Sequence, residues 1–87
     1  MTLKNSLLDA IIDGKIGHGI TISREDFINY FSNVNSDTTG CFLSNSEIKT
    51  GLPHSPTYDH FTIRKSLGVY YIHPLSILNR MQERTLT

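Results

Sequence analysis

The chain has 87 residues, 38% of them hydrophobic, and a formal net charge of zero. This composition predicts one small globular domain and excludes a disordered tail, a strongly basic nucleic-acid binder and a basic membrane-surface peptide. The single cysteine excludes an internal disulfide and a cysteine-based zinc site within one chain. Because the chain shows neither a signal-peptide pattern nor an apolar run approaching about 20 residues, we expect a cytoplasmic protein.

Charge is distributed unevenly along the chain. Residues 1–40 contain three Lys or Arg and five Asp or Glu, whereas residues 41–87 contain five and three. Three of the four histidines also lie in the second part. We therefore expect an anionic partner to meet residues 41–87.

The first elements in the chain are predicted to be helical. Apolar residues at helical spacing predict a helix over 3–13, which Gly14 ends. Residues 20–22 are long enough only for a short strand. Ser23 is then typical of an N-cap and is followed by two acidic residues, which suit the first turn of a helix over 24–33.

The middle of the chain is predicted to be irregular. The stretch "NVNSDTTG" is rich in residues that prefer turns, and Cys41, beside two apolar residues, is expected to be buried. The stretch "SNSE" at 44–47 has the spacing of a capping box and predicts a short helix over 45–50. Two prolines in "LPHSPTYD" indicate a loop.

A β-hairpin is predicted next, because "HFTIRK" and "VYYIH" flank the short turn "SLG", where Gly68 can adopt a positive φ. If Lys65 faces Gly68, His60 pairs with His73. The same register places four residues on the buried side: Phe61, Ile63, Tyr70 and Ile72. Pro74 and the apolar positions that follow it predict a C-terminal helix.

Two readings would make the protein an enzyme. The stretch "GVYYI" resembles the first half of the GIY-YIG nuclease motif, and that resemblance implies a second tyrosine-containing strand with a catalytic arginine and glutamate well downstream. Only residues 73–87 follow, and they are predicted to be helical. A hydrolytic set of Ser55, Asp59 and His60 is disfavoured because neighbours in a strand point to opposite sides. We therefore expect a protein without catalytic residues.

The histidines offer a metal-site hypothesis. His54, His60 and His73 are candidate ligands around the hairpin for zinc or another divalent metal. Their spacing matches no known ligand signature, and exposed or hydrogen-bonded structural histidines are the commoner alternative. Both interpretations stay open, and no cofactor is expected.

These elements predict an α+β fold in which three helices pack on a C-terminal β-hairpin, with a further helix after it. The order helix, short strand, helix, short helix, hairpin resembles that of a winged-helix domain, with "RKSLG" as the wing. This resemblance implies a non-catalytic nucleic-acid-binding accessory or regulator. Aromatic and basic side chains stack on bases and pair with phosphates, so the candidate contacts are Lys49, Tyr58, Arg64, Lys65 and Tyr71.

An alternative function is a homodimeric accessory or inhibitor protein that binds another protein through the hairpin and the C-terminal helix. A homodimer is expected because the chain is short and neutral and has an apolar C-terminal helix. The stretch "HSPTYDHFTIRKSLGVYYIHP" is similar to small uncharacterised proteins of bacterial mobile elements, such as integron cassettes, plasmids and phages, a resemblance that implies no activity. A histidine-based metal protein or a small enzyme is the third hypothesis.

Overall fold

The structure is a computed structural model that describes residues 2–48 and 60–86. Its elements are, in chain order, α1 (Leu3–Ile12), β1 (Thr21–Ser23), α2 (Arg24–Tyr30), α3 (Ser36–Asn45), β2 (Thr62–Ser66), β3 (Val69–Ile72) and α4 (Pro74–Leu86). The three strands form an antiparallel sheet in the order β1-β3-β2. The predicted α+β fold, with a hairpin followed by a C-terminal helix, is confirmed.

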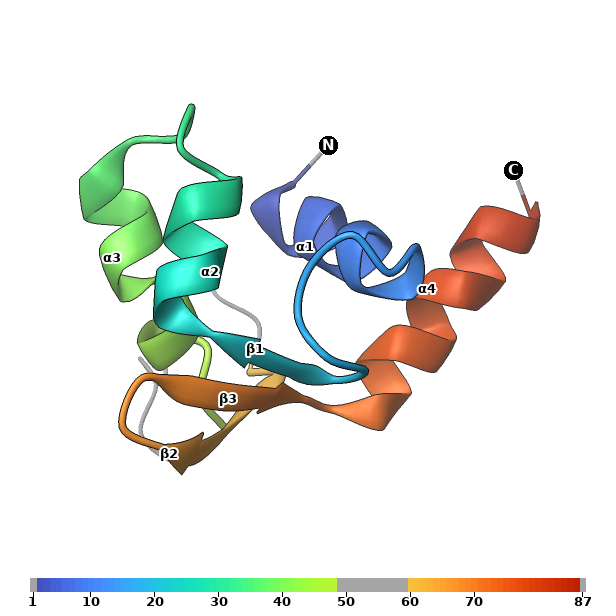
Figure 1. Cartoon of the computed structure of the whole chain (residues 1–87). Coiled ribbons are helices and arrows are strands. Elements are labelled where there is room, and N and C mark those ends of the chain that lie inside the picture. Colours follow the sequence, from blue (N-terminus) through green and yellow to red (C-terminus); the bar gives the residue numbers. More distant parts are fainter. Residues whose placement is uncertain (1, 49–59, 87) are drawn as a thin grey trace.

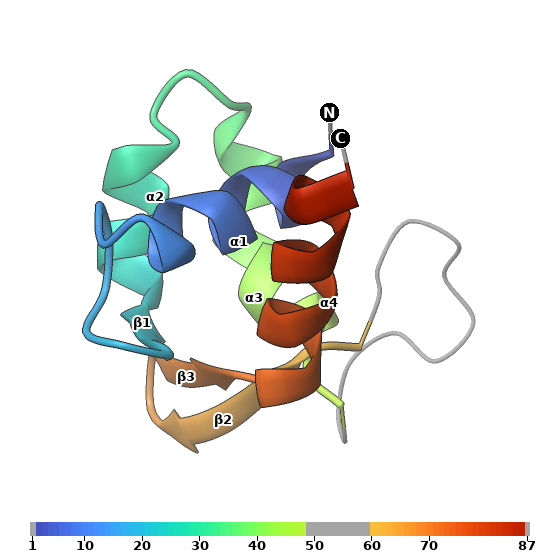
Figure 2. The same cartoon turned by 90° about the vertical axis from the view of Figure 1, so that its right-hand side faces the viewer.

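The described helices all lie on one side of the sheet (Figure 1). In that view α2 and α3 lie above the end of the sheet that carries the hairpin turn, and α1 and α4 lie toward its other end. Turning the molecule shows α1 and α4 side by side (Figure 2). No described helix covers the opposite face of the sheet.

A group of aromatic rings joins these layers. Phe27 of α2 stacks on Phe42 of α3, with ring centroids 5.5 Å apart, and Phe42 meets Phe61 at 6.0 Å. Phe27 and Ile72 have no exposed surface. Further buried residues come from α1, the α1–β1 loop, β1 and β3: Leu7, Leu8, Ala10, Ile11, Ile16, Ile22 and Tyr70.

The first two predicted helices are present with shifted ends. The hydroxyl of Ser23 accepts a hydrogen bond of 3.0 Å from the backbone N–H of Asp26, so Ser23 is the N-cap of α2 as predicted. However, α2 ends at Tyr30 rather than at residue 33. Phe31 leaves the helical conformation and packs in the core against Phe27, with ring centroids 5.1 Å apart.

The predicted helix over 45–50 is wrong, because α3 ends at Asn45 and begins nine residues earlier, at Ser36. The side chain of Asn35 accepts a hydrogen bond of 2.8 Å from the N–H of Asp37 and caps the helix. The polar residues of "NVNSDTTG" therefore start a helix instead of forming a turn, since the same side chains favour both. Cys41 is exposed on this helix, against the prediction that it is buried.

The predicted hairpin is present, but its register is one residue off. Arg64 lies opposite Tyr70 and Ser66 opposite Val69, with a bulge at Lys65 between them. A slip of one residue exchanges the two faces of a strand, so Thr62 faces the core and Ile63 is only half-buried. The predicted burial of three other residues is confirmed: Phe61, Tyr70 and Ile72.

The slip also separates the two hairpin histidines. The N–H of His73 donates to the carbonyl of Phe61 at 2.8 Å, so Phe61 and not His60 lies opposite His73. The predicted pairing of His60 with His73 is therefore wrong. Gly68 does adopt the expected positive φ, at 72°, and the turn closes over Leu67 and Gly68.

Candidate functional site

An open groove with a volume of about 570 Å³ lies where the start of α2, the end of α3 and the hairpin turn meet. The backbone holds these parts together, because the N–H of Arg24 donates to the carbonyl of Gly68 at 2.7 Å. The residues that line the groove come from five elements and the turn: Ser23, Arg24, Glu25, Ser44, Arg64, Leu67, Gly68, Val69 and Tyr70. Two arginines and three residues with hydroxyl groups therefore line one surface depression.

Arg24, the first residue of α2, reaches across to α3. Its Nε donates a hydrogen bond of 3.0 Å to the carbonyl oxygen of Gly40. A Cβ atom at position 40 would lie 3.2 Å from the Nη2 of Arg24, so the glycine lets the guanidinium rest against the helix backbone. The carbonyl oxygen positions the arginine without neutralising its charge.

Arg64 is held on the other side of the groove by an aromatic residue. Its Cζ lies 5.7 Å from the centre of the Tyr70 ring, and its Nη2 donates to the Tyr70 hydroxyl at 3.3 Å. The Tyr70 side chain is itself buried, with 3% of its surface exposed. A cation above an aromatic ring is attracted to the face of that ring, so Tyr70 positions Arg64 and leaves its charge in place.

The charge of the groove is positive. Within the described residues, neither Arg24 nor Arg64 forms an ion pair with a carboxylate, and Glu25 is the one acidic residue in the lining. Guanidinium groups present several N–H donors in a planar fork that matches phosphate and carboxylate oxygens. The groove therefore offers two guanidinium groups to an anionic group such as a phosphate.

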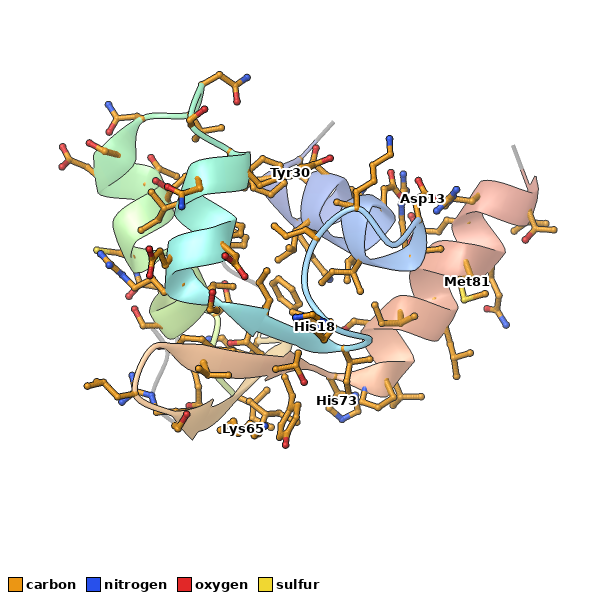
Figure 3. All side chains as sticks on the ribbon, in the orientation of Figure 1. Asp13, His18, Tyr30, Lys65, His73 and Met81 are labelled. Atoms are coloured by element: carbon orange, nitrogen blue, oxygen red, sulfur yellow. The ribbon has the colours of Figure 1, made fainter. Side chains whose placement is uncertain are left out.

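The predicted contacts Lys65 and Tyr71 lie on a different surface from Arg64. Tyr71 pairs with Ile63 and Thr21 on the face of the sheet that no described helix covers. The Nζ of Lys65 lies 5.4 Å from the centre of the Tyr71 ring, and Lys65 is seen below the sheet in Figure 3. The hairpin thus carries one cation and one tyrosine on each side, instead of a single aromatic and basic patch.

The predicted contacts Lys49 and Tyr58 and the candidate metal ligand His54 lie outside the described residues. In the part of the chain that is described, no group of three or more His, Cys, Asp or Glu could hold a metal ion. His73 has another role, because its Nδ1 accepts a hydrogen bond of 3.1 Å from the N–H of Leu75 in the first turn of α4. The direct pairing of His60 with His73 on which the metal-site hypothesis is based is not present, because Phe61 lies opposite His73.

Folding brings two cations of residues 41–87 into ion pairs with acidic residues of the first part of the chain. Arg80 and Arg84 of α4 form ion pairs with Asp9 and Asp13, which belong to or directly follow α1. Asp13 lies beside the last turns of α4 in Figure 3. The cations of the second part that stay available, within residues 60–86, are therefore Arg64 and Lys65 on the hairpin.

Sequence reasoning missed Arg24, which the structure brings to Arg64 across the groove. One signal was present in the sequence. Arg24 directly follows the N-cap Ser23, and a cation is disfavoured at a helix N-terminus by the helix dipole. A cation at such a position needs a compensating contact, and here the contact is the carbonyl of Gly40.

Comparison with protein-family models, with curated protein sequences and with solved structures gives no match to this chain. The resemblance of residues 54–74 to mobile-element proteins therefore stays a prediction. None of the described helices is long and apolar enough to cross a membrane.

Proposed function

We propose that this protein is a non-catalytic binding module that contacts the phosphate backbone of duplex DNA through the groove between α2, α3 and the hairpin turn. The observation that carries the proposal is the pair Arg24 and Arg64, two cations without a carboxylate partner among the described residues, in one open groove. Contacts to phosphate position a protein on DNA and supply most of its sequence-independent affinity.

The arrangement of elements supports the same proposal. Helix–strand–helix–helix–hairpin is the order that resembles a winged-helix domain, and the hairpin turn over Leu67 and Gly68 takes the position of the wing. Leu67 projects from this turn with 96% of its surface exposed. In helix-turn-helix proteins the second helix of the motif enters the major groove, and α3 has the corresponding place in the chain order.

The described surface of α3 limits what kind of binding is expected. Its exposed side chains include Asp37 and Thr38, and Ser36–Asn45 contains no Lys or Arg. Arginine and lysine make the commonest specific contacts to guanine, and α3 offers neither. The proposed binding therefore rests on backbone contacts, is weak at physiological salt, and has little preference for sequence.

A titration of the protein into a short fluorescently labelled DNA duplex at low salt tests the proposal. We expect the anisotropy to rise to saturation with the wild-type protein and the affinity to fall about tenfold in Arg64→Gln. The matched control is Lys15→Gln, which removes the same charge from a loop residue outside the groove. An equal loss in both variants would show only a general charge effect, and the absence of binding at low salt would refute the proposed function.

A further inference from the structure

Helix α4 lies on the molecule with its charged side inward. The guanidinium of Arg80 donates to both carboxylate oxygens of Asp9, at 2.8 and 2.9 Å, and Arg84 donates to Asp13 at 3.0 Å. The side chain of Arg80 is only 14% exposed. These ion pairs fix the rotation of the helix about its own axis, because both arginines must face α1.

The opposite side of α4 is apolar and exposed. No residue of α4 is buried, and only Ile77 packs against the hydrophobic core. Four exposed side chains spaced three or four residues apart lie in one line along this side of the helix: Leu75, Leu78, Gln82 and Leu86. The exposed Asn79 lies beside them. Met81 is exposed on the flank of this line (Figure 3). We refer to the four aligned residues and Met81 as the α4 face.

The α4 face carries no charge. All three charged residues of the helix, Arg80, Glu83 and Arg84, are engaged with one another or with α1. Leu75 is 61% exposed, Leu78 53% and Leu86 87%. Apolar side chains that lie together in one exposed stripe mark an interaction surface, whereas single exposed ones are ordinary.

We propose that the α4 face binds the same face of a second copy of this chain. In a twofold dimer identical surfaces meet, so a surface with net charge would bring like charges together. The α4 face has none, so two copies of it can meet without electrostatic repulsion and can bury their apolar side chains against each other. The leucines would interlock across the two helices, with Gln82 as a central polar position of the kind that sets register in paired helices.

The dimension of the α4 face predicts a weak dimer. A helix of 13 residues is about 20 Å long. The surface area that two such faces bury is therefore smaller than the roughly 1,200–2,000 Å² that is typical of stable specific complexes. We expect a dissociation constant on the order of 100 µM. This inference does not depend on DNA binding.

Sedimentation equilibrium of the full chain at concentrations from tens of micromolar to about 1 mM tests the proposal. Wild-type protein should change from monomer to dimer over this range, and Leu78→Asp should weaken association at least about tenfold, because it places two carboxylates in the interface. Leu75→Asp is a second variant of the same face, and circular dichroism establishes that both variants are folded.

The matched control is Leu67→Asp, since Leu67 is 96% exposed on the hairpin turn, away from α4. It should associate like the wild type. A wild-type protein that stays monomeric up to 1 mM would refute the proposal and leave the α4 face to a different partner. Equal losses in Leu67→Asp and Leu78→Asp would refute it as well, because the interface would then include the hairpin.

Discussion

The guanidinium of Arg80 binds the carboxylate of Asp9 through two hydrogen bonds, across 71 positions of the sequence. This bidentate pair joins the last helix to the first. The hydrogen bond that Arg80 donates lowers the pKa of Asp9 below its usual range, although partial burial of the carboxyl group acts in the opposite direction. The charges of Arg80 and Arg84 lower this pKa further.

The pair predicts a specific dependence of stability on pH. A carboxyl group whose pKa is lower in the folded than in the unfolded chain stabilises the fold above its unfolded pKa, and the stabilisation disappears as the pH falls toward the folded pKa. Asp9→Asn should therefore be less stable than wild type at pH 7, and the difference should become smaller at about pH 3, below the ordinary pKa of 3.8. Urea unfolding at the two pH values measures both differences.

The control for this experiment is Asp37→Asn, which removes a carboxylate from α3, outside the α1–α4 contact. Its effect on stability should not follow the pH profile of Asp9→Asn. If the free-energy difference between wild type and Asp9→Asn were the same at pH 3 and pH 7, the ion pair would not be the source of the stabilisation.

Thr62 is predicted to contribute a buried hydrogen bond that closes the end of α3. The hydroxyl of Thr62 donates to the carbonyl of Leu43 at 2.8 Å, and the side chain has no exposed surface. The carbonyls of a last helical turn lack partners within the helix. Thr62→Val keeps the shape but removes the donor, and should lower the free energy of unfolding by about 1–2 kcal/mol.

Thr38→Val is the matched control, since Thr38 is exposed on α3, the helix whose last turn Thr62 contacts. Its effect on the free energy of unfolding should stay within about 0.5 kcal/mol. Denaturant unfolding gives both values. A Thr62→Val protein as stable as the wild type would mean that the hydrogen bond to Leu43 does not contribute to stability.

The loop between α1 and β1 depends on Gly17. This residue has a φ of 74°, and a Cβ atom there would collide with the carbonyl oxygen of Thr21. The same oxygen accepts the N–H of His18 at 2.9 Å. Gly19 also has a positive φ, of 60°, but a Cβ atom there has no heavy atom within 4 Å.

Gly17→Ala should therefore destabilise the protein more than Gly19→Ala does. Both pay for alanine in the left-handed region, about 1–2 kcal/mol, and Gly17→Ala must in addition move the backbone at Thr21. We expect a difference of at least about 1 kcal/mol between them in thermal or urea unfolding. Equal losses of stability in the two variants would show that the backbone at Thr21 can move away from position 17 at no cost in free energy.

Gly40→Ala is predicted to lower DNA affinity without lowering the stability of the protein. Alanine inside a helix is favoured over glycine by up to about 1 kcal/mol, so α3 should be at least as stable. The new methyl group would lie 3.2 Å from the Nη2 of Arg24, so the guanidinium must shift by a small distance, which strains the hydrogen bond from its Nε to the carbonyl of Gly40. DNA affinity should fall in the anisotropy titration although the protein stays folded, and an unchanged affinity would show that the position of Arg24 does not matter.

Secondary-structure elements are predicted correctly from the sequence where a single local signal determines where they begin or turn. The Ser23 cap, the Gly68 turn and the helix after Pro74 are all where local rules place them. The prediction fails at α3, because Asn and Asp residues are as suitable for a cap as for a turn. Only the burial of Phe42 and Leu43 against the rest of the fold decides in favour of the helix.

The candidate site is harder to predict for the same reason. Arg64 and Lys65 face opposite sides of the hairpin because neighbours in a strand alternate. The bulge at Lys65 shifts the register and so decides which residues of β3 each of them faces, and the sequence has no separate signal for this bulge. Arg24 and Arg64 are 40 positions apart in the sequence and line the same groove because β1, which directly precedes α2, pairs with β3 of the hairpin. The cations that face the groove are therefore a product of sheet topology rather than of local pattern.

The dependence of DNA affinity on salt is the most direct test of the groove. The logarithm of the association constant should fall linearly with the logarithm of the salt concentration, because each phosphate contact releases bound counterions. The double variant Arg24→Gln/Arg64→Gln should have a slope smaller by about 2 than the wild type, since two contacts are lost. Identical slopes in the two proteins would contradict phosphate binding in the groove.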